Sequence, residues 1–206
     1  MRGQRPRRPR GGRPDRNDVE LVLAALQESA RAKIDLSPQE AGRIALAASM
    51  MVAAFRQGRK VILFGNGGSA ADAQHIAAEL VGKFGRERPA LAAIALSVNT
   101  SVITSISNDV EYKAVFARQM EAFAAPGDVA VAISTSGRSP SVLEGVRAAR
   151  ERGARTIGMT GLAGEPLRKV VDLCLTAPSH KTPRIQEVHI TMGHIICELV
   201  ENRLFG

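Results

Sequence analysis

The chain has 206 residues, of which 45% are hydrophobic, and a formal net charge of +8. A chain of this length and composition buries enough apolar surface for one globular domain without disulfides. It contains no run of 18 apolar residues and no apolar signal-peptide core, which argues against a membrane span and against export. Cys174 and Cys197 stand in separate apolar segments, so we expect buried thiols in a reducing cytoplasm.

The positive charge is concentrated at the N-terminus. Residues 1–16 hold seven arginines and one aspartate, a charge of +6, which leaves only +2 for residues 17–206. This tail is rich in Pro, Gly and Arg, so we predict that it is disordered. A salt-sensitive contact with a polyanion and a solvated extension both agree with this composition. Because the body has few aromatic residues and no Trp, we do not expect nucleic acid as a partner.

Two helices are expected ahead of the first strand. Asn17 or Asp18 is suited to cap a helix that ends near residue 34. Ser37 is suited to cap a second helix that ends near residue 57, and Glu40 completes a capping box. Both helices carry broad apolar faces, which must cover either the sheet or another subunit.

Apolar runs that alternate with helical segments indicate the fold class. The predicted strands are residues 61–64, 90–96, 129–133, 156–160 and 173–176, and the last helix covers about residues 183–204. This alternation predicts an α/β fold, a three-layer sandwich around a five-stranded parallel sheet. We expect one domain over 17–206, with helices for oligomerisation in 17–58 and the α/β core with its C-terminal helix in 59–206.

The first strand ends in a glycine-rich turn, Gly-Asn-Gly-Gly-Ser at residues 65–69, and an Ala-rich helix follows. Glycines allow positive φ and let main-chain N–H groups approach a ligand, while Ser69 is suited to cap the helix. Such a helix start favours phosphate. The turn lacks the Gly-Lys-Ser/Thr of a Walker A loop and the acidic residue of a dinucleotide site. We therefore predict a phosphate on a small molecule, although a glycine turn alone is equally typical of a tight connection.

A second polar turn, residues 134–140, follows the predicted strand at 129–133 and opens another helix. Ligands of open parallel sheets bind beyond the carboxyl ends of the strands, where both turns are expected. The hydroxyl groups of the second turn can donate several hydrogen bonds to phosphate oxygens without adding charge. The two turns together strengthen the prediction of a phosphate site.

Four side chains on two helices have the chemistry of zinc ligands. His75 and Glu79 are four residues apart on one helix face, a pair that alone is also typical of an ordinary helix surface. Gln186 and His194 are eight residues apart, about 80° in azimuth, so they can reach one target. Two nitrogens and two oxygens from these residues predict a catalytic zinc site of modest affinity.

The motifs, in this order, closely resemble bacterial phosphoheptose isomerases, the sedoheptulose 7-phosphate isomerases of the sugar isomerase (SIS) superfamily. The resemblance includes Asp72 and the run 184–189, and it covers the chain from Asp18 to the C-terminus. It implies conversion of sedoheptulose 7-phosphate to D-glycero-D-manno-heptose 7-phosphate through an enediol, the first step towards nucleotide-activated heptose. It also implies a cytoplasmic homotetramer with active sites between subunits.

The resemblance assigns roles residue by residue. It implies one zinc ion per subunit, held by His75, Glu79, Gln186 and His194, with Glu79 and His194 also transferring protons. The implied substrate-binding residues are Asn66, Gly67, Gly68, Ser69, Asn108, Asp109, Ser134, Thr135, Ser136, Ser139 and Gln186. Two positions depart from the family pattern, because Asn99 replaces a frequent Asp and His180-Lys181 replaces an often acidic segment.

Two questions stay open at this level. A zinc-bound Glu79 is a poorer base than a free one, so either the ligation loosens during turnover or another group takes the proton. SIS relatives also include sugar-phosphate-sensing regulatory domains and a tetrameric protein that binds the replication initiator. A non-catalytic binding protein is therefore the alternative, although a binder need not retain the catalytic groups that this chain has.

Overall fold

The computed structural model describes residues 15–206. In chain order the elements are α1 (Arg16–Ile34), α2 (Pro38–Arg56), β1 (Val61–Gly65), α3 (Gly68–Val81), β2 (Ala93–Ala95), α4 (Thr100–Asp109), the 3-10 turn η1 (Tyr112–Ala114), α5 (Val115–Phe123), β3 (Val129–Ile133), α6 (Pro140–Glu151), β4 (Arg155–Thr160), α7 (Glu165–Arg168), β5 (Leu173–Thr176) and α8 (Thr182–Phe205). The tail predicted over 1–16 lies outside the described residues except for Asp15, which caps α1, and Arg16, its first residue.

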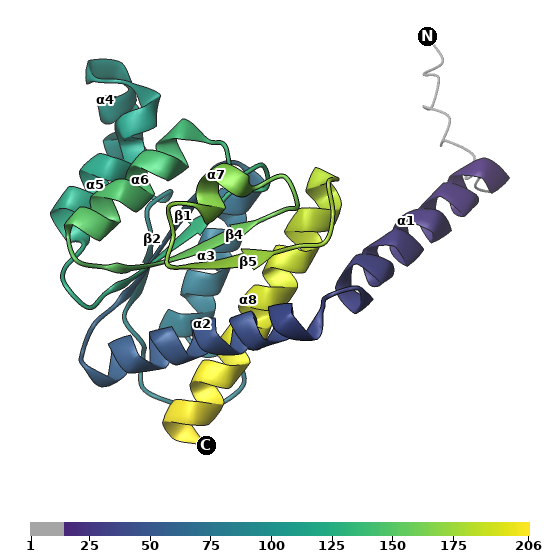
Figure 1. The fold of residues 1–206 in the computed structure, drawn as a ribbon, viewed down its shortest axis with the longest axis horizontal. Coiled ribbons are helices and arrows are strands. Elements are labelled where there is room, and N and C mark those ends of the chain that lie inside the picture. The colour runs from purple at the N-terminus through teal and green to yellow at the C-terminus, as the bar shows by residue number, and fades with distance from the viewer. Residues whose placement is uncertain (1–14) are drawn as a thin grey trace, which may run out of the picture.

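The five strands form one parallel sheet in the order β2-β1-β3-β4-β5 (Figure 1). Both β1 and β3 are buried along their whole length, and their register runs from Val61 opposite Val129 to Gly65 opposite Ile133. One core packs α2, α3 and α8 on one face of the sheet, and a second core packs α5 and α6 on the other face. The predicted three-layer α/β sandwich is therefore confirmed, and its order places β1 and β3 side by side at the centre.

The two N-terminal helices form as expected, but their caps differ in detail. Asp15, rather than Asn17 or Asp18, caps α1 by accepting a hydrogen bond from the Asn17 amide at 2.9 Å. Ser37 caps α2 as predicted, with a 3.1 Å bond from the Glu40 amide. The Glu40 carboxylate does not complete the capping box, because it accepts instead from the Thr176 amide of β5 at 2.7 Å.

Four elements were misjudged or missed by the sequence analysis. β2 covers only Ala93–Ala95, because it lies at the edge of the sheet and pairs with β1 alone. The 3-10 turn η1, α5 and the four-residue α7 were not predicted. η1 and α7, with three and four residues, are too short to give a periodic signal. α5 does have an apolar face, with Val115, Phe116 and Met120 buried, which the sequence analysis left unassigned.

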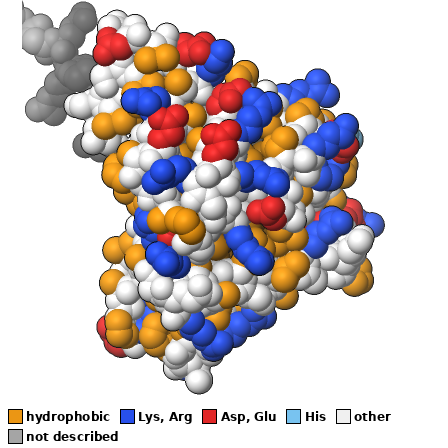
Figure 2. All heavy atoms as spheres, turned by 60° about the vertical axis from the view of Figure 1, so that its left-hand side comes forward, with side chains coloured by type: hydrophobic (Ala, Val, Ile, Leu, Met, Phe, Trp, Pro, Cys, Tyr) orange, Lys and Arg blue, Asp and Glu red, His pale blue; other side chains and the backbone are white. Residues whose placement is uncertain are grey.

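The surface of the body carries charges of both signs. Figure 2 shows basic and acidic side chains interspersed with apolar ones over most of the visible face. Cys174 and Cys197 are both buried and unbridged, as expected. Within residues 15–206 we find no helix with the length and apolar character needed to cross a bilayer.

Helices α3 and α8 pack unusually close to one another. A Cβ atom built on Gly193 of α8 would lie 2.6 Å from Cδ1 of Ile76 on α3, closer than such atoms come in real structures. Ile76 is buried, so it has little room to move away. The missing side chain at Gly193 therefore lets the two helices approach, next to His194 on one helix and His75 on the other.

Replacing Gly193 with Ala should destabilise the protein by about 1–3 kcal/mol, because the added methyl group overpacks this contact. Alanine has a higher helix propensity than glycine, so a net loss of stability would come from the contact with Ile76. Urea unfolding measures the difference.

Gly42→Ala is the matched control, since Gly42 lies inside α2 with nothing within 4 Å of an added Cβ. It should raise the unfolding free energy by about 0.5–1 kcal/mol. Equal stabilisation by both substitutions would show that the α3–α8 contact has room to spare.

Candidate active site

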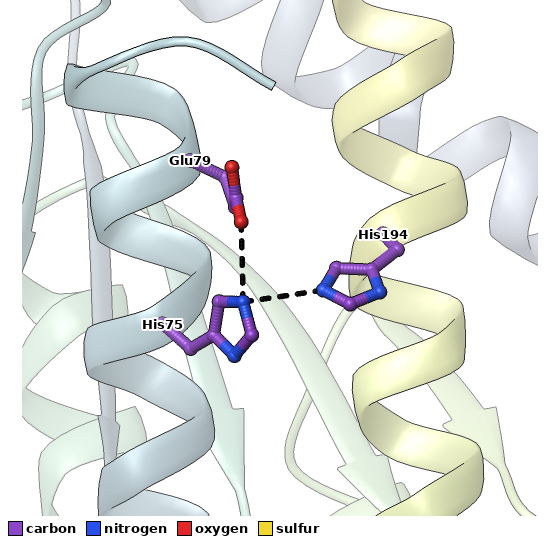
Figure 3. A group of neighbouring side chains, drawn as sticks. All are labelled: His75, Glu79 and His194. Carbon is purple, nitrogen blue, oxygen red and sulfur yellow. Dashed lines mark hydrogen bonds and ion pairs between the residues drawn. The ribbon is translucent and has the colours of Figure 1, made fainter. Parts of the chain in front are cut away.

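His75 lies between the two predicted catalytic side chains, Glu79 and His194 (Figure 3). Its Nε2 atom is 3.1 Å from Oε1 of Glu79 and 3.3 Å from Nε2 of His194. α3 presents His75 and Glu79 one turn apart, and α8 presents His194 from the side. The structure therefore brings together two helices and three of the four predicted zinc ligands.

The geometry of this group fits a zinc ion. Two ligand atoms at about 2.0–2.1 Å from tetrahedral zinc lie about 3.3 Å apart. The two separations from Nε2 of His75, 3.1 and 3.3 Å, are close to that value, and the three residues each offer a ligand atom within 4.8 Å of the others, so Glu79 and His194 need only a small approach to bind one ion. The side chain of His75 is 48% exposed and that of Glu79 is 24% exposed, so a substrate can reach the group from solvent. Such openness is typical of catalytic rather than structural zinc sites.

Gln186, the fourth predicted ligand, belongs to α8, and its side chain reaches the start of α3. Its Nε2 atom would be 2.3 Å from a Cβ on Gly68, so the amide packs directly over that glycine. Within residues 15–206, no side-chain hydrogen bond joins Gln186 to His75, Glu79 or His194. Its role as a ligand stays a prediction, while its contact with Gly68 explains why that position has no side chain.

The glycine turn opens α3 without a side-chain cap. Gly67 takes the N-cap position with a φ of +54°, a conformation that favours glycine. The prediction that Ser69 caps the helix was wrong, because Ser69 is buried within the first turn. The Ser69 amide donates to the Asn66 carbonyl at 3.0 Å and the Ala70 amide to the Gly67 carbonyl at 3.0 Å, so within residues 15–206 it is the Gly68 amide that has no main-chain partner at the start of α3. A helix start of this kind favours an anion.

Polar side chains join the carboxyl ends of β1 and β3. The Asn66 amide donates to Oγ of Ser139 at 2.8 Å and to Oγ of Ser141 at 3.0 Å. The Tyr112 hydroxyl donates to Oδ1 of Asn66 at 2.6 Å. Asn66 and Ser139 were predicted, whereas Ser141 and Tyr112 were not. Tyr112 lies in the unpredicted turn η1. It is the single tyrosine of the chain, and this was the one sequence feature that could have drawn attention to it.

The remaining residues of the second turn have mixed exposure. Ser134 is buried, while Ser136 is exposed and its Oγ accepts from the Arg138 amide at 3.3 Å. The carbonyl of Thr135 accepts from the Gly161 amide at 3.0 Å, which fixes the turn against the end of β4. The substrate-binding roles of these side chains stay predictions.

Asn108 and Asp109 end α4 at an exposed position. The Asn108 amide donates to Oδ1 of Asp109 at 2.8 Å. Among residues 15–206 no hydrogen bond links either side chain to the His75 group or to Asn66. Their part in substrate binding therefore stays a prediction.

The two departures from the family pattern have structural partners. Asn99 caps α4, with its Oδ1 accepting from the Val102 amide at 3.1 Å, and Asn caps a helix as well as Asp does. Lys181 lies 2.5 Å from Oε1 of Glu28 on α1, while His180 is exposed. The basic residue at position 181 therefore binds the first helix to the start of α8.

Comparison with known proteins places this chain in a family. The SIS domain model matches residues 26–161. A phosphoheptose isomerase of Roseiflexus sp. strain RS-1 is 52% identical over 192 residues, covering 93% of this chain and 98% of that protein. The chain belongs to the phosphoheptose isomerase family.

Solved structures of this family share the fold. The phosphoheptose isomerase GmhA from Neisseria gonorrhoeae has a TM-score of 0.84 at 40% identity, over 89% of this chain and 98% of that one. A phosphoheptose isomerase from Francisella tularensis has a TM-score of 0.86 at 32% identity, over 90% and 98%. The predicted family is confirmed, and with it the chain is an isomerase.

Asp72 is a further polar residue near the His75 group, and the sequence analysis gave it no role. It lies one turn before His75 on α3, and its Oδ2 atom is buried without a hydrogen-bond partner. Burial raises the pKa of the Asp72 carboxyl to about 6, and the nearby His75 opposes that rise. The folded protein thus holds an acidic group that ionises less readily than in the unfolded chain.

Asp72→Asn should stabilise the metal-free protein at pH 7.5 but not near pH 4. The folded-state pKa lies above the unfolded value of 3.8, so wild-type stability falls as pH rises through about 4 to 6. Asn does not ionise, so the variant does not lose stability over this pH range. The difference in unfolding free energy between variant and wild type should therefore grow by up to about 3 kcal/mol between about pH 4 and pH 6. Urea unfolding with a chelator present measures it, and an advantage that does not change with pH would contradict the assignment.

Proposed function

We propose that the chain converts sedoheptulose 7-phosphate to D-glycero-D-manno-heptose 7-phosphate, the ketose–aldose step that begins the synthesis of nucleotide-activated heptose. The observation that carries the proposal is the group of His75, Glu79 and His194, held within 4.8 Å on two helices. A regulatory protein of the same fold needs a sugar-phosphate pocket but no such group. Half of the residues are also identical to those of an isomerase over nearly its full length.

The phosphate is assigned to the sheet edge, where the uncapped start of α3 and the turn after β3 meet. His75 stands eight residues beyond Gly67 on α3, about 12 Å along the helix axis. An extended seven-carbon sugar phosphate has a comparable length, so its far end can reach the His75 group. Phosphate binding then orients the reacting carbons without touching them.

Isomerisation removes a proton from C1 and adds one to C2, while the C1 hydroxyl loses a proton and the C2 oxygen gains one. We assign the carbon-bound proton to the Glu79 carboxylate and the oxygen-bound protons to the His194 imidazole. The two groups come from different helices and flank His75. A carboxylate has two oxygens, so one can face a cation while the other faces the substrate.

We propose zinc as the cofactor, held by His75, Glu79 and His194, with Gln186 as the predicted fourth ligand. When bound, it would stabilise negative charge that develops on the substrate oxygens. The support for zinc is the donor set and its spacing.

Proton NMR in D2O with sedoheptulose 7-phosphate tests the function. The wild-type protein with zinc should give aldose signals with deuterium at C2, and chelation should remove the activity. Glu79→Gln and His194→Gln should each lower kcat by at least about 100-fold, since each removes a proton-transfer group.

Glu198→Gln is the control, because Glu198 is an exposed carboxylate one turn beyond His194 on α8. It should leave kcat unchanged. Full activity in both the Glu79 and His194 variants would refute the mechanism. A substrate that raises the melting temperature of the wild-type protein without turnover would favour the binding-protein alternative.

We also propose a homotetramer in the cytoplasm, in which α1 contributes to the subunit contacts. α1 extends away from the α/β body (Figure 1). Leu21 is 68% exposed and Ile34 is 75% exposed in the single chain. The other large apolar side chains exposed on α1 are Val19, Val22, Leu23 and Leu26. An apolar helix of this kind is normally covered by a partner, and the two unbridged cysteines suit a reducing compartment.

The double substitution Val22→Asp and Leu26→Asp should reduce the assembly to smaller species, because it introduces two charges one turn apart on α1. Sedimentation velocity measures the particle mass. Gln27→Asp is the control for a negative charge on this helix, since Gln27 is an exposed polar residue and the substitution introduces one of the same charges without removing an apolar side chain. A wild-type protein that sediments as a monomer would refute the proposed assembly.

A further inference from the structure

A buried ion pair joins the loop after α3 to the end of α8. The Nε atom of Arg88 lies 2.8 Å from Oε1 of Glu201, and their side chains are only 1% and 3% exposed. Neither residue belongs to the His75 group or to the polar sheet edge. Burying two charges is costly unless their hydrogen bonds are satisfied. The other hydrogen-bond partners of Arg88 and Glu201 therefore show which segments the pair connects.

Glu201 organises the loop between α3 and β2. Its carboxylate accepts hydrogen bonds from three consecutive main-chain amides, those of Phe84 at 2.8 Å, Gly85 at 2.9 Å and Arg86 at 3.1 Å. The loop is therefore wrapped around one carboxylate that α8 provides. Removing the charge would weaken four hydrogen bonds at once, counting the bond from Arg88.

Arg88 binds the last turn of α3. Its Nη2 donates to the carbonyl of Glu79 at 2.7 Å, and its Nη1 donates to the carbonyl of Leu80 at 2.9 Å. Carbonyl groups at a helix C-terminus lack helical partners and carry partial negative charge, which a guanidinium satisfies. The main chain of Glu79, whose carboxylate faces His75, is thus fixed directly by Arg88.

The same loop contacts the second helix of the site. The Phe84 ring packs on the His194 ring with centroids 5.6 Å apart, and the His194 ring lies 4.9 Å from the His75 ring. Glu201 follows His194 by seven residues, two turns along α8, so both project from one face of that helix. Through the amide of Phe84, Glu201 holds the ring that supports His194.

We propose that Arg88 and Glu201 are positioning residues of the isomerase site. The pair joins the turn that carries Glu79 to the helix that carries His194, and so sets the spacing of the three side chains that bind the metal and transfer protons. This inference rests on the proposed function, because it assigns the pair a role in that reaction. Neither residue touches the substrate.

Glu201→Gln tests the proposal against a matched substitution, Asp128→Asn. Asp128 is also a buried carboxylate, 1% exposed, and accepts from the Lys60 amide, the Lys60 ammonium and the Ala125 amide at 3.0, 2.6 and 2.9 Å. It precedes β3, at the sheet edge opposite the site. Both variants should lose stability, so stability alone does not distinguish the roles.

Only Glu201→Gln should lower kcat, by about tenfold or more, with KM changed less than about threefold. It should also weaken zinc binding by about 10- to 100-fold, the usual effect of disturbing the partners of metal ligands. Competition with a chromogenic chelator measures zinc affinity independently of catalysis. Asp128→Asn should stay within about twofold of wild type in both measurements.

Arg88→Lys is a second variant, in case Glu201→Gln fails to fold. It keeps the charge but loses the fork that reaches both carbonyls, so kcat and zinc affinity should again fall while KM holds. If the Glu201 and Arg88 variants match Asp128→Asn in kcat and zinc affinity, the positioning role is wrong. A wild-type protein that binds zinc but does not isomerise the heptose phosphate would refute the proposed function, and the zinc measurements would still decide this inference.

Discussion

The close packing of α3 against α8 is the constraint on which the site depends. The helices run in parallel and meet at three levels, with Gly68 under the Gln186 amide, Ile76 against Gly193, and the end of α3 joined to Glu201 through Arg88. His75 and His194 lie next to the middle level. Because protein interiors are close-packed, a change at either end shifts the spacing between His75 and His194. Side chains on two packed helices are also held more precisely than side chains on loops.

The site divides into two halves with different physical character. At the sheet edge, neutral groups prevail, namely helix amides, hydroxyls and the Asn66 amide, which can hold a charged phosphate without a cluster of basic residues. Between the helices, titratable side chains prevail. The near-neutral charge of residues 17–206 agrees with this division, since recognition of the anion does not require a strongly positive body.

Two carboxylates near the site, the buried Glu201 and the half-buried Asp72, have opposite environments. Glu201 accepts three main-chain hydrogen bonds and one from a guanidinium, so it supports the structure. Asp72 has an oxygen with no partner, and burial raises its pKa to about 6, so it costs stability at neutral pH. Unfavourable polar burial commonly accumulates at functional sites, where stability is given up for chemistry.

The sequence predicted what depends on local pattern and missed what depends on contacts between distant segments. The strands β1 and β3 have continuous apolar runs because both of their faces are buried, so their positions were predicted to within one residue. The spacing of His75 and Glu79 follows from the helical repeat. The approach of His194 depends on Gly193 facing Ile76, which no local pattern reveals. The family resemblance supplied that link.

Two local features, the cap of α3 and the turn η1, were also missed, because neither follows from residue pattern alone. The cap of α3 was misassigned because the positive φ of Gly67 replaces a side-chain cap. The turn η1 has no periodic signal of its own, so the contact of Tyr112 with Asn66 could not be predicted. Both features depend on backbone geometry rather than on residue pattern.

The hydrogen bond from Tyr112 to Asn66 has an optical consequence. The chain has one tyrosine and no tryptophan, so its near-ultraviolet absorption and emission are dominated by a single phenol. That phenol is 52% exposed and bonded to a side chain at the polar edge of the site. The protein thus contains its own chromophore where the sugar phosphate is assigned, and exchange of solvent for ligand there can be followed without a label.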